Sequence, residues 1–400
     1  MKSPLEFTVT DVLPGGHARC GVIETPHGSF HTPAFMPVGT RGTVKGLLPG
    51  LVRMTGTQVL LNNAYHLMLR PGDDLVARQG GMHRFMGWDG PILTDSGGFQ
   101  AFSMSDTSSI NDDGVIFNSI IDGARINLTP ERAIEVQNNL GADIIMAFDD
   151  CPPSVFGGND HDESSHARRL EEAVDRTTSW LHRCVEAHAR PSEQALFGIV
   201  QGGTDPALRA RSLAEVTAVD LPGYAIGGVA VGESPELIHG IVADTAPQLP
   251  REKPRYLMGV GYERDLVRAV ASGVDMFDCV LPTRNGRTAS AFTREGRINL
   301  KNARFKDDSL PIDPRCTCLA CAGTSGSLEV DLDQPGEGFS RAYLRHLFLA
   351  EEMLGPILVS MHNIQHFQSL MLDIRRAIRD DAWLSMERDW PVLGETVGTS

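Results

Sequence analysis

Aromatic residues, long apolar runs and signs of a targeting segment are all scarce in this chain of 400 residues. Only 6% of the residues are aromatic, which argues against an open sugar-binding groove, because such grooves are usually lined by aromatic rings. No uninterrupted apolar run reaches the ~18 residues that a membrane-spanning helix needs, so no such helix is expected. Residues 1 to 16 contain no long apolar stretch and no small-residue cleavage site. We therefore expect no secretory signal and a cytoplasmic location.

Positive charge is also in short supply, because 36 Lys and Arg stand against 51 Asp and Glu, giving a formal net charge of -15. Phosphates bind clustered Lys and Arg, so this balance argues at first sight against a nucleic-acid partner. The basic residues are nevertheless concentrated between positions 281 and 306, where Glu295 is the one acid among seven of them: Arg284, Arg287, Arg294, Arg297, Lys301, Arg304 and Lys306. This segment predicts a basic patch on an acidic protein, with an ordinary solvated surface as the alternative.

The cysteines predict a metal site. Cys316, Cys318 and Cys321 have a C-x-C-x2-C spacing, which suits three thiolates on one tetrahedral ion. In a reducing compartment this cluster indicates zinc rather than disulfides. Three downstream histidines could supply the fourth ligand, and the spacing does not choose among His346, His362 and His366. A closed Cys3His site leaves no open coordination position, so we expect the zinc to be structural.

Short apolar runs alternate with amphipathic stretches of helical length through the middle of the chain. Strands are expected at 91–95, 143–149, 196–201, 224–228, 256–260 and 275–280. Helices are expected at 130–140, about 163–189, 206–219, 234–246 and 263–272. This alternation requires a parallel sheet, either doubly wound or closed. No GxGxxG fingerprint follows an early strand, so we favour an α/β fold of the (β/α)8 TIM-barrel type.

The alternation of strands and helices ends after Lys306, where a segment rich in turn formers carries the three clustered cysteines. Helical patterns resume at about residue 341. We therefore predict a barrel core over 1–305, with a β-rich N-terminal lead-in. A zinc-binding subdomain with C-terminal helices is predicted over 306–385, with an inserted loop at about 322–339.

Six polar or glycine residues stand where predicted strands end, and the carboxyl ends of barrel strands meet at one mouth. They are Asp95, Asp149, Gln201, Gly228, Gly259 and Asp278. A helix cap or turn could explain any single one, and taken singly we favour that explanation for Gln201 and the two glycines. A carboxylate on an otherwise apolar strand, such as Asp95 or Asp278, costs free energy unless it is paired or used.

Two carboxylates at one mouth suit glycosidic chemistry, in which one attacks the anomeric carbon and the other moves a proton. Gly97 and Gly98 follow Asp95 and permit close approach of a ligand to the backbone. We interpret Asp149 as a base-recognition group, because an ionised carboxylate accepts hydrogen bonds from the ring N–H and amino group of a purine.

Several long motifs between residues 7 and 380 resemble one enzyme family: TPAFMPVGTRGTVK, NNAYHLMLRPG, MGWDGPILTDSGGFQ, GADIIMAFDDCPP, FGIVQGG, YAIGGVAVGE, YLMGVG, MFDCVLPTRNGR and INLKNARF. The family is the tRNA-guanine transglycosylases, also called queuine tRNA-ribosyltransferases. The resemblance implies a zinc-containing barrel that replaces the wobble guanine of tRNAs with a GUN anticodon (Asp, Asn, His, Tyr). The incoming base would be a 7-deazaguanine precursor of queuosine.

The resemblance also implies residue roles, with Asp278 as the nucleophile on C1′ of the ribose and Asp95 as the general acid/base. The base would be held by Asp95, Ser96, Gly97, Gly98, Phe99, Asp149, Gln201, Gly228, Val229, Glu233 and Met258. The RNA would be contacted by Gly259, Val260, Gly261, Tyr262, Glu263, Arg264, Asp265, Thr283, Arg284, Asn285, Gly286 and Arg287. The zinc ligands would be Cys316, Cys318, Cys321 and His362, the histidine of the MHN sequence.

The likeness is closest to bacterial members, which have a valine at Val231 that narrows the pocket, where eukaryotic members have glycine. It therefore implies 7-aminomethyl-7-deazaguanine as the incoming base, with Glu233 and backbone groups near Val229 receiving its ammonium. It also suggests a homodimer. Two departures stand out: Asp150 replaces the usual glutamate, and the insertion at 322–339 is longer than usual.

Two other functions share some of these features. A retaining glycoside hydrolase would use two carboxylates as well, but it would need the aromatic groove that this composition argues against. A non-catalytic tRNA-binding accessory subunit would keep the motifs without the chemistry. The presence of both Asp95 and Asp278 in intact motifs argues against it.

Overall fold

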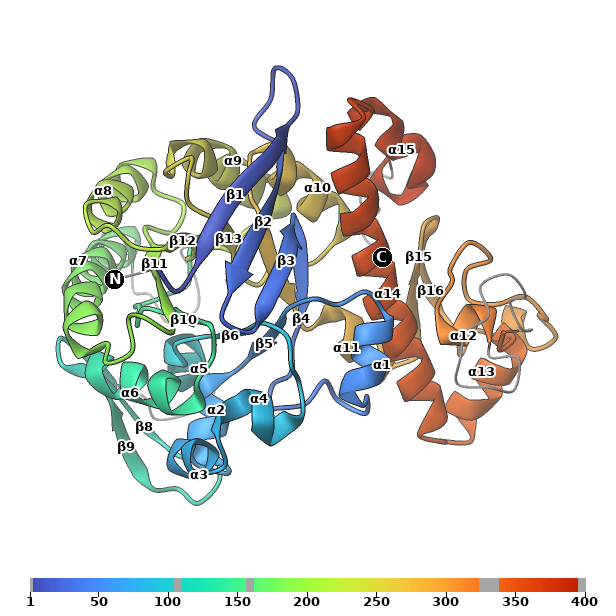
Figure 1. Ribbon diagram of the computed structural model, residues 1–400, viewed down its shortest axis with the longest axis horizontal. Helices are drawn as coiled ribbons and strands as arrows, with labels where there is room; N and C mark the ends of the chain where they lie inside the picture. Colours follow the sequence, from blue (N-terminus) through green and yellow to red (C-terminus); the bar gives the residue numbers. More distant parts are fainter. Residues whose placement is uncertain (1–2, 104–108, 156–161, 324–337, 395–400) are drawn as a thin grey trace.

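The computed structural model describes residues 3–103, 109–155, 162–323 and 338–394 (Figure 1). A parallel eight-stranded sheet in the order β4-β14-β13-β12-β11-β10-β6-β5 forms its centre. The strands are β4 (Ala34–Pro37), β5 (Leu60–Asn62), β6 (Ile92–Thr94), β10 (Ile144–Met146), β11 (Ala195–Val200), β12 (Gly223–Ile226), β13 (Arg255–Leu257) and β14 (Met276–Cys279). A parallel bridge between Val38 and Leu61 joins the two edges of the sheet. The prediction of a (β/α)8 barrel is confirmed.

Helices follow the strands along the chain and cover the barrel (Figure 1). They are α1 (Pro49–Met54), α2 (Ala64–Leu69), α3 (Asp73–Arg78), α4 (Gly81–Met86), α5 (Gly98–Ser103), α6 (Pro130–Leu140), α7 (Glu163–Ala187), α8 (Pro206–Thr217), α9 (Pro235–Thr245), α10 (Glu263–Ala271) and α11 (Leu281–Gly286). Capping residues set several of their starts: the side chains of Thr129, Asp205 and Ser234 accept from backbone N–H groups at the N-termini of α6, α8 and α9. The five predicted helices are confirmed to within a few residues at their ends.

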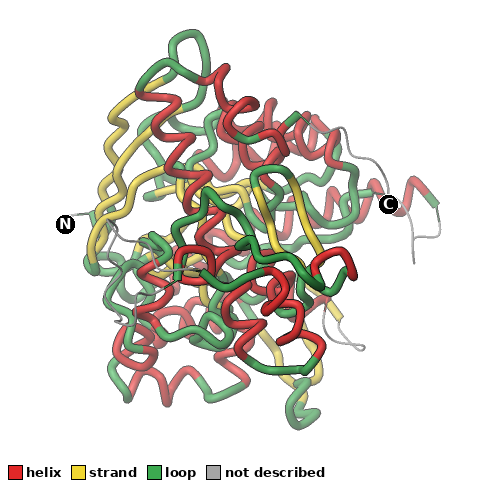
Figure 2. Tube along the Cα trace, turned by 90° about the vertical axis from the view of Figure 1, so that its right-hand side faces the viewer, coloured by secondary structure: helices red, strands yellow, loops and turns green. Residues whose placement is uncertain are grey.

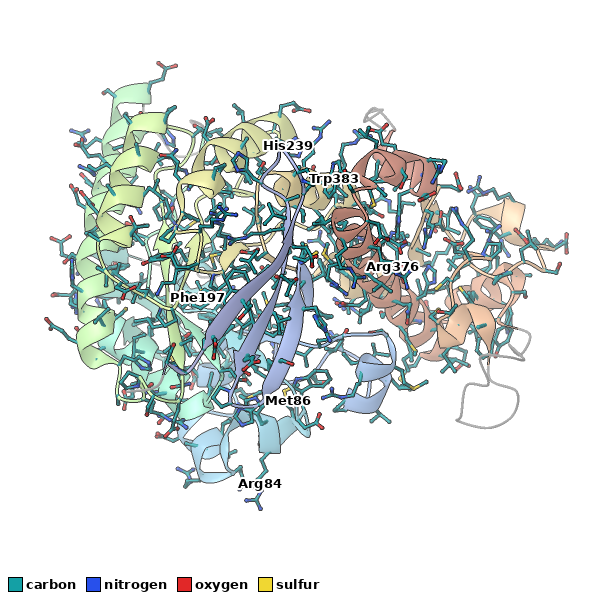
Figure 3. The ribbon with its side chains drawn as sticks, turned by 45° about the horizontal axis from the view of Figure 1, so that its top comes forward. Arg84, Met86, Phe197, His239, Arg376 and Trp383 are labelled. Carbon is teal, nitrogen blue, oxygen red and sulfur yellow. The ribbon has the colours of Figure 1, made fainter. Side chains whose placement is uncertain are left out.

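Two barrel strands, β4 and β5, were not predicted. β4 has four residues and β5 has three, and all of them are buried. Length and burial alone do not explain the difference, because β6, β10 and β13 are equally short and buried and were predicted. Figure 3 labels Phe197 of β11. Its side chain belongs with Met36 of β4 and Leu93 of β6 to one cluster of buried apolar residues.

An antiparallel sheet of β1 (Glu6–Val12), β2 (Arg19–Thr25) and β3 (Gly28–Thr32) covers the amino-terminal ends of the barrel strands. Arg19 of β2 pairs with Asp275, which immediately precedes β14. His27, in the turn between β2 and β3, contacts Asp143, which immediately precedes β10. Figure 2 shows this sheet in yellow at the edge of the molecule beside the N-terminus. The lower end of the barrel is therefore closed, which leaves the carboxyl ends of the strands for a site.

Two further small sheets stand outside the barrel. β7 (Ser109–Asn111), β8 (Gly114–Asn118) and β9 (Arg125–Leu128) are inserted between β6 and α6. β15 (Ser290–Thr293) and β16 (Gly296–Asn299) form a hairpin after the barrel. The C-terminal part adds α12 (Leu319–Ala322), α13 (Arg341–Leu349), α14 (Leu354–Arg379) and α15 (Met386–Asp389). Four short 3-10 turns complete the elements of the described residues: Ala246–Gln248, Ala303–Phe305, Trp383–Ser385 and Pro391–Leu393.

The long helix α14 lies between the barrel and the C-terminal subdomain (Figure 1). On one side Phe367 stacks on Phe35 of β4, with ring centroids 4.8 Å apart. On the other, Asn363 accepts from Phe292 N of β15 and donates to carbonyl oxygens of Pro282 and Ser290. Because α14 packs on both parts, the predicted boundary at residue 305 stays a prediction. Most of the predicted loop at 322–339 lies outside the described residues.

No helix of the described part of the chain combines the length and apolarity needed to cross a bilayer.

Candidate active site and metal centre

A cavity of about 260 Å³ opens at the carboxyl ends of the barrel strands. Of the predicted base-binding and catalytic residues, those that line it are Asp95, Ser96, Phe99, Asp149, Gly228, Val229, Met258 and Asp278. Gly259, predicted to contact RNA, and Val231 line it as well. The topology thus brings predicted residues that are up to 183 positions apart in the sequence, from position 95 to position 278, into one pocket.

The two carboxylate oxygens of Asp278, on β14, differ in their hydrogen bonding. The hydroxyl of Tyr256 donates to Oδ1 over 2.6 Å, and the backbone N–H of Gly259 donates to the same oxygen over 2.9 Å. Burial raises the pKa of Tyr256 well above its usual value, so its hydroxyl stays protonated and donates. Among the described residues no donor reaches Oδ2. The carboxylate is therefore oriented through one oxygen while the other is free to react.

Asp95 follows β6 and is held by three uncharged donors. The side-chain amides of Asn63 and Gln100 donate to Oδ2, and the backbone N–H of Ala64 donates to Oδ1 over 2.8 Å. Burial raises the pKa of Asp95 to about 6 despite these donors, and the neighbouring Asp278 adds to the rise. A carboxyl group with a pKa in this range can both give and take a proton near neutral pH.

Asp149 follows β10 on the same cavity. Gln201 donates to its Oδ2 over 2.6 Å, and the hydroxyl of Ser96 lies 3.5 Å from Oδ1. Burial raises its pKa to about 6, with a further contribution from the charge of Asp150. Gln201 itself does not line the cavity, so it acts on the site through Asp149.

The unusual residue Asp150 lies away from the cavity. Two arginines of α7 hold its carboxylate: Arg169 donates to both oxygens over 2.5 and 2.8 Å, and Arg176 donates over 2.5 Å. Asp150 therefore anchors α7 and does not line the cavity.

The loop after β12 forms one wall of the cavity through residues 227–231. Glu233 lies behind this wall. Its carboxylate accepts from the N–H groups of Ala230 and Val231 over 2.6 and 3.0 Å, and from the hydroxyl of Ser154 over 2.6 Å. Ala230 has a φ of +61°, which is costly for a residue with a side chain. The carboxylate of Glu233 thus braces a strained backbone at the edge of the pocket.

Gly97 and Gly98 also face away from the cavity. A Cβ at Gly97 would stand 3.1 Å from Tyr65 N, and one at Gly98 would stand 3.0 Å from the carbonyl oxygen of Asp149. The φ of Gly97 is +79°, so this position favours glycine on conformation as well as on space. These glycines let α5 begin directly behind Asp95.

Three polar groups of the site were not predicted: Asn63 and Gln100 contact Asp95, and Tyr256 contacts Asp278. Asn63 lies in the NNAYHLMLRPG motif and directly follows β5, but because this strand was not predicted, the sequence did not mark Asn63 as a residue at a strand end. Tyr256 gave no signal, because it reads as one apolar residue within a strand.

The predicted RNA-contacting residues divide into an exposed and a buried group. Gly259, Tyr262 and Arg284 are exposed, and Tyr262 keeps 47% of its surface. Arg264, Asp265, Asn285 and Arg287 are half-buried, whereas Val260, Gly261, Glu263, Thr283 and Gly286 are buried. Glu263 points inward, where its Oε1 lies 2.7 Å from Nε2 of His366 on α14. The buried members can support the backbone of the predicted RNA-contacting surface, but their side chains are not exposed on it.

Part of the predicted basic patch is used within the protein. Arg294 stacks over the ring of Trp390 and lies 3.0 Å from the carboxylate of Asp373. The exposed members of the segment are Arg284, Arg297, Lys301, Arg304 and Lys306.

The four predicted metal ligands converge in the C-terminal subdomain. Atoms that could ligate one ion lie within 4.8 Å of one another on Cys316, Cys318, Cys321 and His362. Nδ1 of His362 lies 3.3 Å from Sγ of Cys321 and 3.6 Å from Sγ of Cys318. Its Nε2 lies 2.7 Å from the carbonyl oxygen of Phe292, which fixes the tautomer that offers Nδ1 to a metal. The donor set and its spacing fit a tetrahedral metal ion.

A second histidine cluster, at the closed end of the barrel, fits a metal less well. His27, His83 and Asp143 also lie within 4.8 Å of one another. The two imidazole rings are stacked, with centroids 3.5 Å apart and planes 15° from parallel. An ion shared by two stacked rings would lie far out of both ring planes, away from the nitrogen lone pairs. These residues form a hydrogen-bonded cluster instead.

Among the described residues, the mouth of this parallel barrel holds carboxylates without cationic partners, which is typical of an enzyme, and two carboxylates on one pocket are typical of glycosyl transfer. The comparisons agree. The family model described as queuine tRNA-ribosyltransferase matches residues 15–391. A queuine tRNA-ribosyltransferase of Cyanothece sp. is 52% identical over 97% of this chain and 95% of its own length. That of Thermus thermophilus is 51% identical over 94% of this chain and 91% of its own.

The chain belongs to the queuine tRNA-ribosyltransferase family. It is therefore an enzyme, a pentosyltransferase. The non-catalytic alternative is set aside with this result.

Proposed function

We propose that this enzyme exchanges the wobble guanine of tRNAs with a GUN anticodon (Asp, Asn, His, Tyr) for 7-aminomethyl-7-deazaguanine, in the biosynthesis of queuosine. The observation that carries the proposal is the arrangement of three carboxylates around one small cavity: Asp95 and Asp149 are buried, and Asp278 is half-buried. Two of them suffice for the bond exchange, and the third is available to recognise the base.

In this mechanism the open Oδ2 of Asp278 attacks C1′ of the ribose. The bond between C1′ and guanine breaks, its electron pair stays with the guanine nitrogen, and Asp95 supplies the proton. The ribose remains bound to Asp278 as an ester. The incoming base then gives a proton to Asp95 while its ring nitrogen attacks C1′ and releases Asp278. The raised pKa of Asp95 supports both proton transfers.

Recognition of the base is assigned to Asp149, because its carboxylate can accept from the ring N–H and amino group of a guanine-like base. Gln201 orients it, and Ser96, Phe99, Gly228, Val229 and Met258 enclose the base. Val231 lines the cavity, which supports a compact aminomethyl substituent rather than bulkier queuine. The carbonyl groups near Val229, backed by the charge of Glu233, would receive its ammonium.

The tRNA is assigned to the rim formed by residues 259–265 and 283–287. Exposed Tyr262 and Arg284 supply a ring for stacking and a cation for phosphate. The exposed basic side chains between positions 297 and 306 extend this surface away from the cavity. They supply the positive charge that an acidic protein needs to bind RNA.

The assembly is proposed to be a cytoplasmic homodimer. Large apolar side chains are exposed around α1 and the turn between α13 and α14: Leu48 keeps 71% of its surface, Met353 79% and Leu349 53%. A side-chain atom of Ile357 on α14 would lie 3.4 Å from a Cβ at Gly46, which places this turn beside the segment that leads into α1. A second copy of the chain would cover this surface.

The exchange is tested by incorporation of labelled guanine into unmodified tRNA-Tyr, with and without competing 7-aminomethyl-7-deazaguanine. We expect incorporation that the competitor suppresses. Incorporation that the competitor leaves unchanged would reject the assigned incoming base. No incorporation by a folded protein that binds tRNA would reject the exchange itself.

The Cys3His cluster is proposed to hold one structural Zn²⁺ per subunit. Cys318→Ser should lose the bound zinc and unfold at a lower temperature, because zinc binding contributes folding free energy. Cys184→Ser is the matched control, since Cys184 is equally buried but contacts the backbone N–H of Phe148 instead of other cysteines. Zinc content and thermal unfolding check both variants. Full zinc content in Cys318→Ser would contradict the ligand assignment.

A further inference from the structure

Arg209, on α8, is buried beneath two loops of the candidate active site, with 5% of its surface exposed. Its Nε donates to the carbonyl oxygen of Gly203 over 2.9 Å, Nη1 to that of Val200 over 3.2 Å, and Nη2 to that of Gly228 over 3.0 Å. In the part of the chain that the structure describes, no carboxylate lies within ion-pair distance of this guanidinium. Arg209 is thus a buried cation whose direct partners are three backbone carbonyl groups.

Such a cation is costly to bury, because neutral carbonyl oxygens replace water, and the carboxylate of Glu233 acts on it only from beyond ion-pair distance. Burial lowers the pKa of Arg209 to about 10, so the group still carries its charge at neutral pH. A neutral side chain could fill the same space without this cost. The fork of three donors must therefore do something at these carbonyl groups that a space-filling residue would not.

The carbonyl groups belong to the end of β11 and to the two loops that flank the base pocket. Val200 and Gly203 bracket Gln201, whose side chain donates to Asp149. Gly228 begins a peptide unit that continues into Val229, which lines the cavity. In a trans peptide the C=O and the following N–H point in opposite directions. Because the carbonyl of Gly228 points to Arg209, the N–H of Val229 points away from it.

That N–H has no acceptor among the described residues, although Val229 is 5% exposed. The same region is sterically tight, since a Cβ at Gly228 would lie 2.3 Å from Oε1 of Gln201. Small rotations of either loop would therefore move the Val229 N–H and the Gln201–Asp149 pair relative to each other.

We propose that Arg209 is a positioning residue for base recognition: it holds the Gly228–Val229 peptide and the Gln201 loop together, so that a backbone donor and the Asp149 acceptor meet one purine-type base. The inference rests on the proposed function. It assigns Arg209 no contact with the base and no part in proton transfer.

The test compares Arg209→Met and Arg209→Lys with the wild-type zinc-loaded enzyme. For Arg209→Met we expect kcat/KM for guanine to fall by about 100-fold, as for a misplacement of binding groups by about 1 Å, mostly through a higher KM. The affinity for tRNA should stay unchanged. Arg209→Lys keeps the positive charge but loses the planar guanidinium, so its KM for guanine should lie between those of the wild type and Arg209→Met. Equilibrium binding of guanine, measured by calorimetry, gives a readout independent of turnover.

Arg375→Met is the matched control. Arg375 is half-buried, its pKa is likewise lowered to about 10 by burial, and it donates to the carbonyl oxygen of Pro33 over 2.7 Å at the closed end of the barrel. Its loss should lower the melting temperature without changing the KM for guanine. Equal increases in KM for Arg209→Met and Arg375→Met would overturn the proposal, because the effect would then follow stability alone.

The remaining outcomes separate this inference from the proposed function. If the wild type exchanges guanine and Arg209→Met keeps its KM and guanine affinity, the positioning role is wrong and the function stands. If the wild type binds guanine without exchanging it and Arg209→Met loses that binding, the positioning role stands and the exchange is wrong. A wild type that neither binds nor exchanges guanine would overturn both.

Discussion

The two ends of the barrel hold buried carboxylates in different ways. At the closed end, Arg19 donates to both oxygens of Asp275 over 2.6 and 2.9 Å. Ring nitrogens of His27 and His83 lie 2.8 and 3.1 Å from the two oxygens of Asp143. Each of these carboxylates therefore meets a group that is or can become a cation.

At the mouth, Asp95, Asp149 and Asp278 meet only uncharged donors among the described residues: side-chain amides, hydroxyls and backbone N–H groups. Burial raises the pKa of all three. It raises the pKa of Asp275 as well, so the kind of partner, and not the shift alone, distinguishes the two ends. A buried carboxylate without a cationic partner lowers stability. Such a group is retained where function requires it, which is why it marks a functional site.

The largest effect is expected from Asp278→Asn. It should slow guanine exchange by at least about 10³-fold, because the amide removes the nucleophile. The carbonyl oxygen of the new amide can still accept from Tyr256 and Gly259, so the fold should be kept. Because burial raises the pKa of Asp278, the neutral amide should leave the melting temperature at neutral pH equal to or higher than that of the wild type. Exchange rates, thermal unfolding and trapping of the enzyme–RNA adduct on a denaturing gel check this. An adduct that still forms in the variant would contradict the assignment of the nucleophile.

The difference between the two ends was only partly predictable from the sequence. Asp149 and Asp278 could be assigned to the mouth because each comes late in an apolar run, and the topology brings the carboxyl ends of strands together. The closed end could not be assigned in this way. Asp275 pairs with a residue 256 positions away and Asp143 with one 116 positions away, so only the folded chain shows their partners.

The supporting groups of the site were hidden for a related reason. Tyr256 reads as a core residue of a strand, and Arg209 as one of several charges on an amphipathic helix. Their functional contacts arise because neighbouring strands and loops are in register, and no periodicity records that register. The family resemblance implied that Glu233 receives the ammonium of the base; in the structure its carboxylate accepts from Ala230, Val231 and Ser154, and its contact with a base stays a prediction.

Asp275→Asn makes the matching change three positions from Asp278, at the closed end of the same strand. It should lower the free energy of unfolding by about 3 kcal/mol, because the buried Arg19 loses its counter-charge. The kcat and KM for guanine should be largely unchanged in the folded protein. Urea unfolding and exchange kinetics at saturating tRNA measure the two effects. Loss of exchange without loss of stability would show that the closed end also serves the reaction.

Asp95→Asn sharpens the comparison through the dependence of stability on pH. The pKa of Asp95 is raised from its usual 3.8 to about 6, so the folded protein binds this proton more tightly than the unfolded chain does. The resulting stabilisation is fully present below pH 3.8 and is lost as the pH rises through about 6. The ionised carboxylate then costs on the order of 2–3 kcal/mol, which the neutral amide avoids. Asp95→Asn should therefore gain stability over the wild type between pH 4 and pH 8.

Asp143→Asn should behave in the opposite way. Burial tends to raise the pKa of Asp143, but hydrogen bonds from His83 and the backbone of Ile92 hold it below its usual value. Its contribution to stability is therefore present above that usual value and is lost as the pH falls, so the variant should be weakest relative to the wild type near pH 8. Urea unfolding of both variants between pH 4 and pH 8 gives the two trends. Parallel trends would mean that the carboxylates at both ends of the barrel serve stability alone. The contrast between the mouth and the closed end would then be wrong.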